Sequence, residues 1–396
     1  MRFGSERTAL ACLMGDSDLL RALGLAHLPC AVVAEPGSPL RYSRFTRIAI
    51  DWGGEITADS EALVDRLIRF AAGQAEPPVL FYENSDHLLL LSRYRERLAT
   101  AFRFVIAGPA LVEDLVDKLR FHVLAERLHL PVPATRRINP AAAERPAEAL
   151  DLRFPVVVKP PTRSSAWREI AGWHKALQLD TPDDLQHLWP RLAADRGEFL
   201  VQEMVPGPET CIESYHVYVD EAGNTAGEFT GRKIRTFPAS CGFSTALMIS
   251  DAPDVSALGR DLVGRLALRG VAKFDFKRAP DGRLVLLEVN PRFTLWHHLG
   301  AVAGVNLPAL VYADLTGLPR PAARRARAGV KWCGLGHDWR AAKADGMAFS
   351  EWLFWALRCE AKALNWDDPL PFLRAVLLRS RRARPELKAE PQKATI

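Results

Sequence analysis

Three oxygen-bearing side chains between residues 275 and 290 have the types and the spacing of a metal site. Asp275 lies in one apolar run, Glu288 and Asn290 lie in the next, and Pro280-Asp281-Gly282 separates the two runs. The tripeptide predicts a hairpin, because proline and glycine supply the backbone angles of a tight turn. Glu288 and Asn290 then share one strand face, with Asp275 across from them. Such hard oxygen ligands suit Mg²⁺ bound together with phosphates, and the alternative is ordinary polar residues at strand ends.

Several basic residues have the placement expected of phosphate ligands. Lys159 ends the apolar run FPVVVK, where an unpaired charge is costly and a phosphate partner would explain it. Lys118 lies in a predicted helix, and its alternative role is that of a solvated helix lysine. Arg232 and Lys233 lie in the predicted strand TGRKIRT, where either one can also be an ordinary surface charge. A triphosphate held by metal ions still requires cations on its outer oxygens.

The segment FLVQEMVPG predicts a strand that stops at Pro206-Gly207. The end of this strand exposes backbone N–H and C=O groups that could hydrogen-bond to the edge of an adenine. Glu209 comes shortly after it, and its carboxylate could accept hydrogen bonds from ribose hydroxyls. The alternative is a plain exit from a strand into a loop.

The elements that must position these residues fall into two kinds. The first hundred residues alternate short apolar runs with amphipathic stretches, which predicts an open α/β domain. From Thr210 onward, alternating runs separated by turn residues predict an antiparallel α+β unit. The fold class is therefore a combination of α/β and α+β. The strands predicted in the first part are Ala9–Met14, Cys30–Ala34, Val79–Tyr82 and Phe104–Ile106.

These motifs, in this order, resemble the ATP-grasp ligases. The likeness is to the branch that contains D-aspartate ligase and other carboxylate-amine ligases, and more distantly to D-alanine:D-alanine ligase and biotin carboxylase. It runs from Thr8 to about Leu318. The resemblance implies a Rossmann-like domain at 1–109, a small lid subdomain at 110–200, a grasp subdomain with an antiparallel sheet at 201–318, and a helical extension with a basic tail at 319–396.

The resemblance also implies a role for each candidate residue. Asp275, Glu288 and Asn290, spaced 13 and then 2 positions apart, correspond to the metal ligands. The segment 160–167 departs from the family pattern, because it has no glycine before Gly172. The other implied roles are ATP-phosphate binding for Lys118 and Lys159, purine contact for Gln202, main-chain contacts to the base for Glu203, Met204 and Val205, ribose binding for Glu209, phosphate contact for Arg232 or Lys233, and contact with the phosphate or carboxyl phosphate for Arg292.

The activity implied by the resemblance is ATP-dependent ligation of a carboxylate to an amine through an acyl phosphate. ATP and Mg²⁺, or Mn²⁺ in its place, would bind between the grasp subdomains. Two alternatives stay open. One is a carboxylase similar to biotin carboxylase, and the other is a catalytically silent ATP-binding regulatory protein, which the glycine-poor loop suggests.

Composition limits the partners and the compartment. The 396 residues carry a formal charge of +5, and seven basic against two acidic residues from Arg374 onward place that excess in the C-terminal tail. The tail could touch an anionic surface weakly, or it is simply solvated. We expect small-molecule substrates, no nucleic acid and no membrane span, since no apolar run approaches the roughly 20 residues that a span needs. Six scattered cysteines favour the cytoplasm, and a homodimer is compatible with the sequence.

Overall fold

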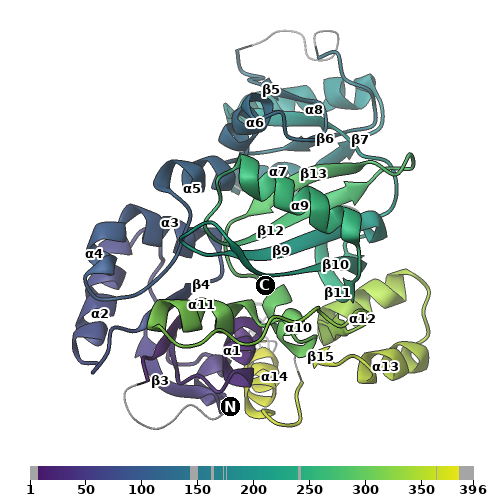
Figure 1. Cartoon of the computed structure of the whole chain (residues 1–396). Coiled ribbons are helices and arrows are strands. Elements are labelled where there is room, and N and C mark those ends of the chain that lie inside the picture. Colours follow the sequence, from purple (N-terminus) through teal and green to yellow (C-terminus); the bar gives the residue numbers. More distant parts are fainter. Residues whose placement is uncertain are drawn as a thin grey trace, which may run out of the picture.

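The computed structural model describes residues 8–142, 150–161, 165–172, 174, 176–239, 242–362 and 364–382. Figure 1 shows the N-terminal domain at the lower left, a small sheet at the top and a large sheet between them, with the C-terminal helices along the bottom and the right. The mixture of parallel and antiparallel sheets confirms the predicted fold class.

The N-terminal domain is a four-stranded parallel sheet in the order β3-β2-β1-β4 with helices around it. Three of the four predicted strands form, whereas Phe104–Ile106 does not, and only the neighbouring Arg103 makes a single bridge to Val79. An edge strand, β3, was not predicted, because its half-buried residues alternate poorly. The elements are β1 (Ala11–Met14), α1 (Ser17–Leu25), β2 (Cys30–Ala34), η1 (Pro39–Tyr42), β3 (Thr46–Asp51), α2 (Ser60–Ala72), β4 (Val79–Tyr82), α3 (Ser85–Arg93) and α4 (Arg95–Ala99).

The lid has a hydrophobic core of its own around Trp167 and Phe199, separate from the main core. Its antiparallel sheet has the order β5-β8-β6-β7. The last strand of this sheet in sequence order, β8, crosses the expected boundary at residue 200, so the lid sheet continues to Glu203. The elements are α5 (Pro109–Val116), α6 (Lys118–Arg127), β5 (Thr135–Ile138), β6 (Val156–Lys159), α7 (Ser165–Ala171), β7 (Leu177–Leu179), α8 (Pro182–Asp195) and β8 (Phe199–Glu203).

The large sheet has seven strands in the order β13-β12-β9-β10-β11-β14-β15. Helix α9 packs closely on β9, because Gly259 has no side chain and a Cβ there would lie 2.2 Å from the Tyr215 ring. The elements are η2 (Glu209–Cys211), β9 (Ile212–Val219), β10 (Thr225–Phe237), β11 (Phe243–Ser250), α9 (Pro253–Arg265), β12 (Gly270–Arg278), β13 (Leu284–Asn290), α10 (Trp296–Val302), α11 (Leu307–Thr316), β14 (Lys331–Cys333) and β15 (Ala361–Lys362).

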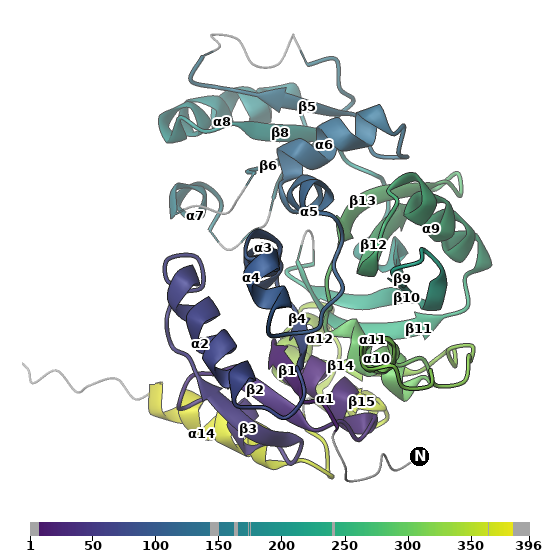
Figure 2. The same cartoon turned by 60° about the vertical axis from the view of Figure 1, so that its left-hand side comes forward.

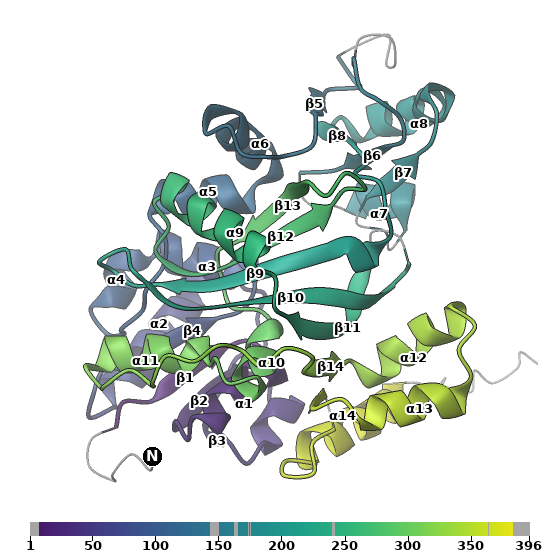
Figure 3. The ribbon, with the colours of Figure 1, turned by 45° about the vertical axis from the view of Figure 1, so that its right-hand side comes forward.

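The C-terminal extension is bound to both larger domains. Its strands β14 and β15 complete the large sheet, so the extension is not helical alone, and Figure 3 shows α12 and α13 continuing from that edge. Figure 2 shows α14 lying along the N-terminal domain, where Ser43 donates a hydrogen bond to Asp368 at 2.6 Å. The basic tail at residues 383–396 lies outside the described residues. The helices are α12 (Leu335–Ala344), α13 (Phe349–Leu357) and α14 (Leu370–Arg382).

Within the described part of the chain, no single helix is both long enough and apolar enough to cross a membrane. One helix pair, Trp296–Val302 with Leu307–Thr316, meets the length and composition test, but it is bent by 88°.

Candidate active site

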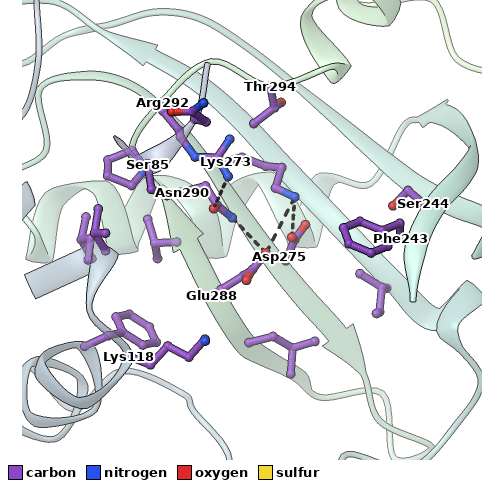
Figure 4. Close-up of a pocket in the computed structure, with 18 of the residues that line it drawn as sticks. Ser85, Lys118, Phe243, Ser244, Lys273, Asp275, Glu288, Asn290, Arg292 and Thr294 are labelled. Atoms are coloured by element: carbon purple, nitrogen blue, oxygen red, sulfur yellow. Dashed lines mark hydrogen bonds and ion pairs between the residues drawn. The ribbon is translucent and has the colours of Figure 1, made fainter. Parts of the chain in front are cut away.

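The hairpin formed by β12 and β13 brings the three predicted metal ligands together (Figure 4). Gly282 takes a positive φ of 86° in its turn, which favours glycine. Asp275 pairs directly with Glu288 in the ladder, so both side chains lie on one face. The amide of Asn290 donates a hydrogen bond to Glu288 Oε1 at 2.9 Å. The register therefore creates the oxygen-rich cluster that the spacing predicted.

A lysine that the sequence analysis missed lies in the same cluster. Lys273 pairs with Asn290 in the ladder, and its Nζ is 2.5 Å from Asp275 Oδ2 and 4.0 Å from Glu288 Oε1. Burial raises the pKa of Asp275, but the positive charges of Lys273 and Lys233 outweigh it and hold that pKa below its usual range. The strand period could have predicted this lysine, because Lys273 precedes Asp275 by two residues and therefore shares its strand face.

The donor set fits a divalent metal ion. Two carboxylates and an amide are the hard oxygen donors that Mg²⁺ prefers. The ammonium of Lys273 lies 2.5 Å from Asp275 and 4.0 Å from Glu288, so a metal ion bound by these carboxylates would have to displace that ammonium. Among the described residues, no cluster of three or more His, Cys, Asp or Glu could hold a metal ion, so this candidate site has only two carboxylates and depends on Asn290 for its third donor.

The two predicted ATP lysines lie in the wall of the cavity next to this cluster. Lys118 begins α6, and its Nζ donates to the carbonyl oxygens of Pro160 at 3.0 Å and Pro161 at 3.2 Å. Lys159 ends β6 and donates to Gln202 Oε1 at 2.8 Å. The structure thus brings Lys118, Lys159 and Gln202 to one cavity, with both ammonium groups held by neutral acceptors.

None of the three residues after Gln202 is among the described residues that line the cavity. The carboxylate of Glu203 points away from it and binds Arg153 at 2.8 Å. The N–H groups of Glu203 and Met204 already donate to Ala134 O and Pro155 O, at 2.8 and 3.0 Å. This placement gives no support to the predicted base contacts of Glu203, Met204 and Val205, whereas Gln202 does line the cavity.

Glu209 lies between two lysines of the large sheet. Its carboxylate is 3.9 Å from Lys233 Nζ and 4.0 Å from the Nζ of Lys277, a buried lysine that the sequence analysis did not select. Lys233 lines the cavity, whereas the neighbouring Arg232 is exposed and does not. Successive residues of a strand point to opposite faces, so only one of this pair can reach the site.

Arg292 connects the candidate metal ligands Asp275, Glu288 and Asn290 (the metal-ligand cluster) with the N-terminal domain. Its Nη2 donates to Asn290 Oδ1 at 3.1 Å, and its Nη1 donates to the main-chain oxygen of Glu83 at 2.6 Å. Burial of this guanidinium lowers its pKa. The ends of β13 and β4 are therefore one side chain apart.

All three domains line one cavity of about 910 Å³. The N-terminal domain contributes Asp16, Glu83 and Ser85, and the β10–β11 hairpin contributes Phe243 and Ser244. Residues 162–164 of the glycine-poor loop lie outside the described residues. A cavity of this size is within the range of sites for nucleotide-sized ligands.

The chain is similar to one protein family and to a D-aspartate ligase. Residues 195–333 match the family described as "ATP-grasp in the biosynthetic pathway with Ter operon". The D-aspartate ligase of Enterococcus faecium (strain Aus0004) is 23% identical over 296 residues, which cover 72% of this chain and 70% of that protein.

Solved structures share the fold. Biotin carboxylase from Campylobacter jejuni superimposes with a TM-score of 0.62 at 13% identity, over 82% of this chain and 74% of that chain. L-amino acid ligase from Bacillus licheniformis gives a TM-score of 0.59 at 14% identity, over 79% and 75%. At these identities the structural likeness shows the fold alone.

Proposed function

We propose that this chain, which matches an ATP-grasp family over residues 195–333 and is 23% identical to a D-aspartate ligase, uses ATP and Mg²⁺ to convert a carboxylate into an acyl phosphate, which an amine then attacks to give an amide. The D-aspartate ligase relative makes amino acids the first carboxylates and amines to test. Because the reaction consumes ATP, the proposal places it in the cytoplasm.

One observation supports this proposal above the others. The Asp275–Glu288–Asn290 cluster and the lysines Lys118 and Lys159 line the same cavity, although they come from different domains. A metal site alone or a lone lysine alone has many explanations. The cavity therefore offers oxygen donors that can bind a cation and ammonium groups that can bind an anion. A triphosphate with a bound metal ion needs both.

Asp275, Glu288 and Asn290 would hold the Mg²⁺, which would supply positive charge to the phosphate oxygens. Lys118 and Lys159 would exchange their neutral carbonyl and amide acceptors for phosphate oxygens. Arg292 and Lys233 would offset charge on the transferring phosphoryl group. Catalysis would then rest on positioning and electrostatics rather than on a covalent residue.

Two bond exchanges make up the reaction. A carboxylate oxygen attacks the γ-phosphorus, and the bond from that phosphorus to the bridging oxygen of ADP breaks. The amine nitrogen then attacks the carbonyl carbon, and the carbon–oxygen bond to phosphate breaks. Water must be kept from the acyl phosphate, and a site enclosed by three domains is suited to that.

The test is release of ADP and phosphate by purified protein with ATP, Mg²⁺ and a panel of amino acids, with mass spectrometry of the products for a new amide. Glu288→Gln should abolish release, because it removes a metal-binding charge. Glu221→Gln, an exposed acid in the β9–β10 turn, is the matched control and should keep full activity.

Other outcomes identify the alternatives. ATP binding without release for any carboxylate and amine pair would contradict the ligase and favour a regulatory protein. Release that requires bicarbonate and a carboxyl acceptor would instead indicate a carboxylase.

A further inference from the structure

The cavity has a wall that none of the roles above uses. It is formed where β1 and β4 end, and these strands are hydrogen-bonded parallel neighbours. Gly15 and Asp16 follow β1, and Glu83, Asn84 and Ser85 follow β4; all five line the cavity. The carboxyl edge of a parallel sheet is where α/β domains bind ligands.

Two carboxyl groups on this wall interact with each other and have no basic partner among the described residues. Glu83 is 9% exposed, and its Oε2 accepts a hydrogen bond from the Asp16 N–H at 2.6 Å. Asp16 caps α1 and is open to the cavity. Within the described residues, neither forms an ion pair, whereas the nearby Asp18 binds His298 at 2.8 Å. Arg292 donates to the main-chain oxygen of Glu83 and not to its carboxylate.

Both carboxylates are held where negative charge is unfavourable. Burial, followed by the charge of Asp16, raises the pKa of Glu83 well above its usual value. Asp16 is itself exposed, and desolvation by the atoms around its carboxylate together with the charge of Asp18 raises its pKa to about 6. A cationic group placed between them would remove this disadvantage.

A third polar group points independently to a ligand at this wall. Thr294 is 7% exposed and lines the cavity, yet its hydroxyl has no hydrogen-bond partner in the described part of the chain. It follows Phe293, whose ring packs on Phe81 and Tyr82 with centroids 5.3 and 5.5 Å apart, so it lies beside the end of β4. Buried hydroxyls without a partner are uncommon in proteins. Figure 4 shows Thr294 near Arg292 and Ser85, above the metal-ligand cluster.

We propose that Glu83 and Asp16, together with the Thr294 hydroxyl, bind the ammonium group of the amine substrate. This inference rests on the proposed function and adds to it the cationic form in which the amine is recognised. Arg292 spans from Asn290 to the Glu83 main chain, so the amine would be held one side chain away from the metal-ligand cluster where the acyl phosphate forms.

The same carboxylates can prepare the amine for attack. An ammonium group has no lone pair, so it must lose one proton, which Glu83 or Asp16 takes. The neutral amine then forms the carbon–nitrogen bond, the acyl carbon–oxygen bond breaks, and the second proton leaves with the phosphate. An alcohol of the same size carries no charge to match the two carboxylates and would not be held.

Charge-removing variants that keep the local hydrogen bonds test this site. Glu83→Gln retains an oxygen that can accept from the Asp16 N–H, and Asp16→Asn retains a residue that caps helices well. Ethylammonium serves as the probe and ethanol as its uncharged counterpart, with binding followed by ligand-observed NMR. Glu35→Gln is the matched control, because Glu35 follows β2 at the same sheet edge but is exposed outside the cavity.

Wild-type protein and Glu35→Gln should bind ethylammonium and not ethanol. Glu83→Gln should weaken this binding on the order of 30-fold, as expected for loss of one partner from a buried charge contact. Asp16→Asn should weaken it by a smaller factor, because Asp16 is exposed. ATP affinity should stay unchanged in all variants, which shows that they are folded. If Glu83→Gln also loses ATP binding, that variant is not correctly folded, and the ethylammonium affinity of Asp16→Asn then tests the site.

Ethylammonium binding that is absent in wild-type protein, or unchanged in both charge-removing variants, would overturn the inference. ADP release separates it from the proposed function. Turnover with an amine whose KM is unchanged in Glu83→Gln contradicts the ammonium site and leaves the ligase standing. Ethylammonium binding that depends on Glu83, without ADP release for any carboxylate, supports the site and contradicts the ligase.

Discussion

Replacing Asp338 with alanine should detach the C-terminal extension from the large sheet. Asp338 is completely buried and joins α12 to β10 and β11. Its carboxylate accepts hydrogen bonds from Arg235 at 2.6 and 2.9 Å, from Thr245 at 2.9 Å and from the Trp352 indole at 2.9 Å. The Arg235 side chain is itself only 9% exposed.

The magnitude follows from what the substitution leaves behind. Removing one partner of a buried ion pair costs about 3–5 kcal/mol, because the remaining charge is uncompensated. The hydroxyl of Thr245 and the indole N–H of Trp352 lose their acceptor as well, and such losses are not simply additive. We therefore expect Asp338→Ala to lower the free energy of unfolding by about 3–5 kcal/mol. Adding Arg235→Met removes the orphaned charge and should restore part of that loss.

Urea unfolding, combined with hydrogen exchange over residues 331–362, measures this effect locally, because the chain has several cores. Exchange should rise in the extension and not in the lid. Asp345→Ala, an exposed acid at the end of the same helix, is the control. A loss below about 1 kcal/mol, which is the effect of an ordinary surface change, would refute the reasoning. So would a double variant as unstable as Asp338→Ala alone.

Three further predictions concern the site and its support. Lys159→Met should weaken ATP binding roughly 10- to 100-fold, because a hydrogen bond to a charged group is lost; titration calorimetry measures it, and unchanged affinity contradicts the assigned role. Asp16→Asn should be more stable than wild type at pH 7.5. The difference in stability between the variant and wild type should shrink as the pH falls through about 6 toward 3.8, because the raised pKa of Asp16 makes its ionised form unfavourable in the folded state. Thermal melts of both proteins across this pH range measure the difference, and a variant that is less stable than wild type at pH 7.5 would contradict the prediction. Gly231→Ala should cost about 1–3 kcal/mol in urea unfolding, since its Cβ would lie 2.2 Å from the Trp296 ring, and a neutral result would contradict that packing.

The metal-ligand cluster was predictable because hairpins obey local rules. A turn tripeptide and a strand period of two were enough to place Asp275 opposite Glu288 and Asn290. The same period would have separated Arg232 from Lys233 and added Lys273. Charge alone does not distinguish Arg232 from Lys233, whereas the strand face does.

The ammonium site was not predictable in the same way. Glu83 and Thr294 are more than 200 positions apart and meet only because Phe293 packs against the end of β4. Nothing local to either residue shows that Glu83 would be buried without a basic partner. Long-range packing also decides that the N–H groups of Glu203 and Met204 already donate to the carbonyl oxygens of Ala134 and Pro155.

The sequence by itself determined the elements, the order of the motifs and the chemistry of the metal-ligand cluster, since these depend on side-chain type, turn residues and periodicity. Tertiary structure alone decided which lysines face the cavity and that Arg292 joins two domains. It also decided that Glu83 and Asp16 line the cavity without a basic side chain beside them in the described part of the chain. Burial and charge pairing are properties of neighbours in space, and neighbours in space are fixed only when the separate sheets pack together.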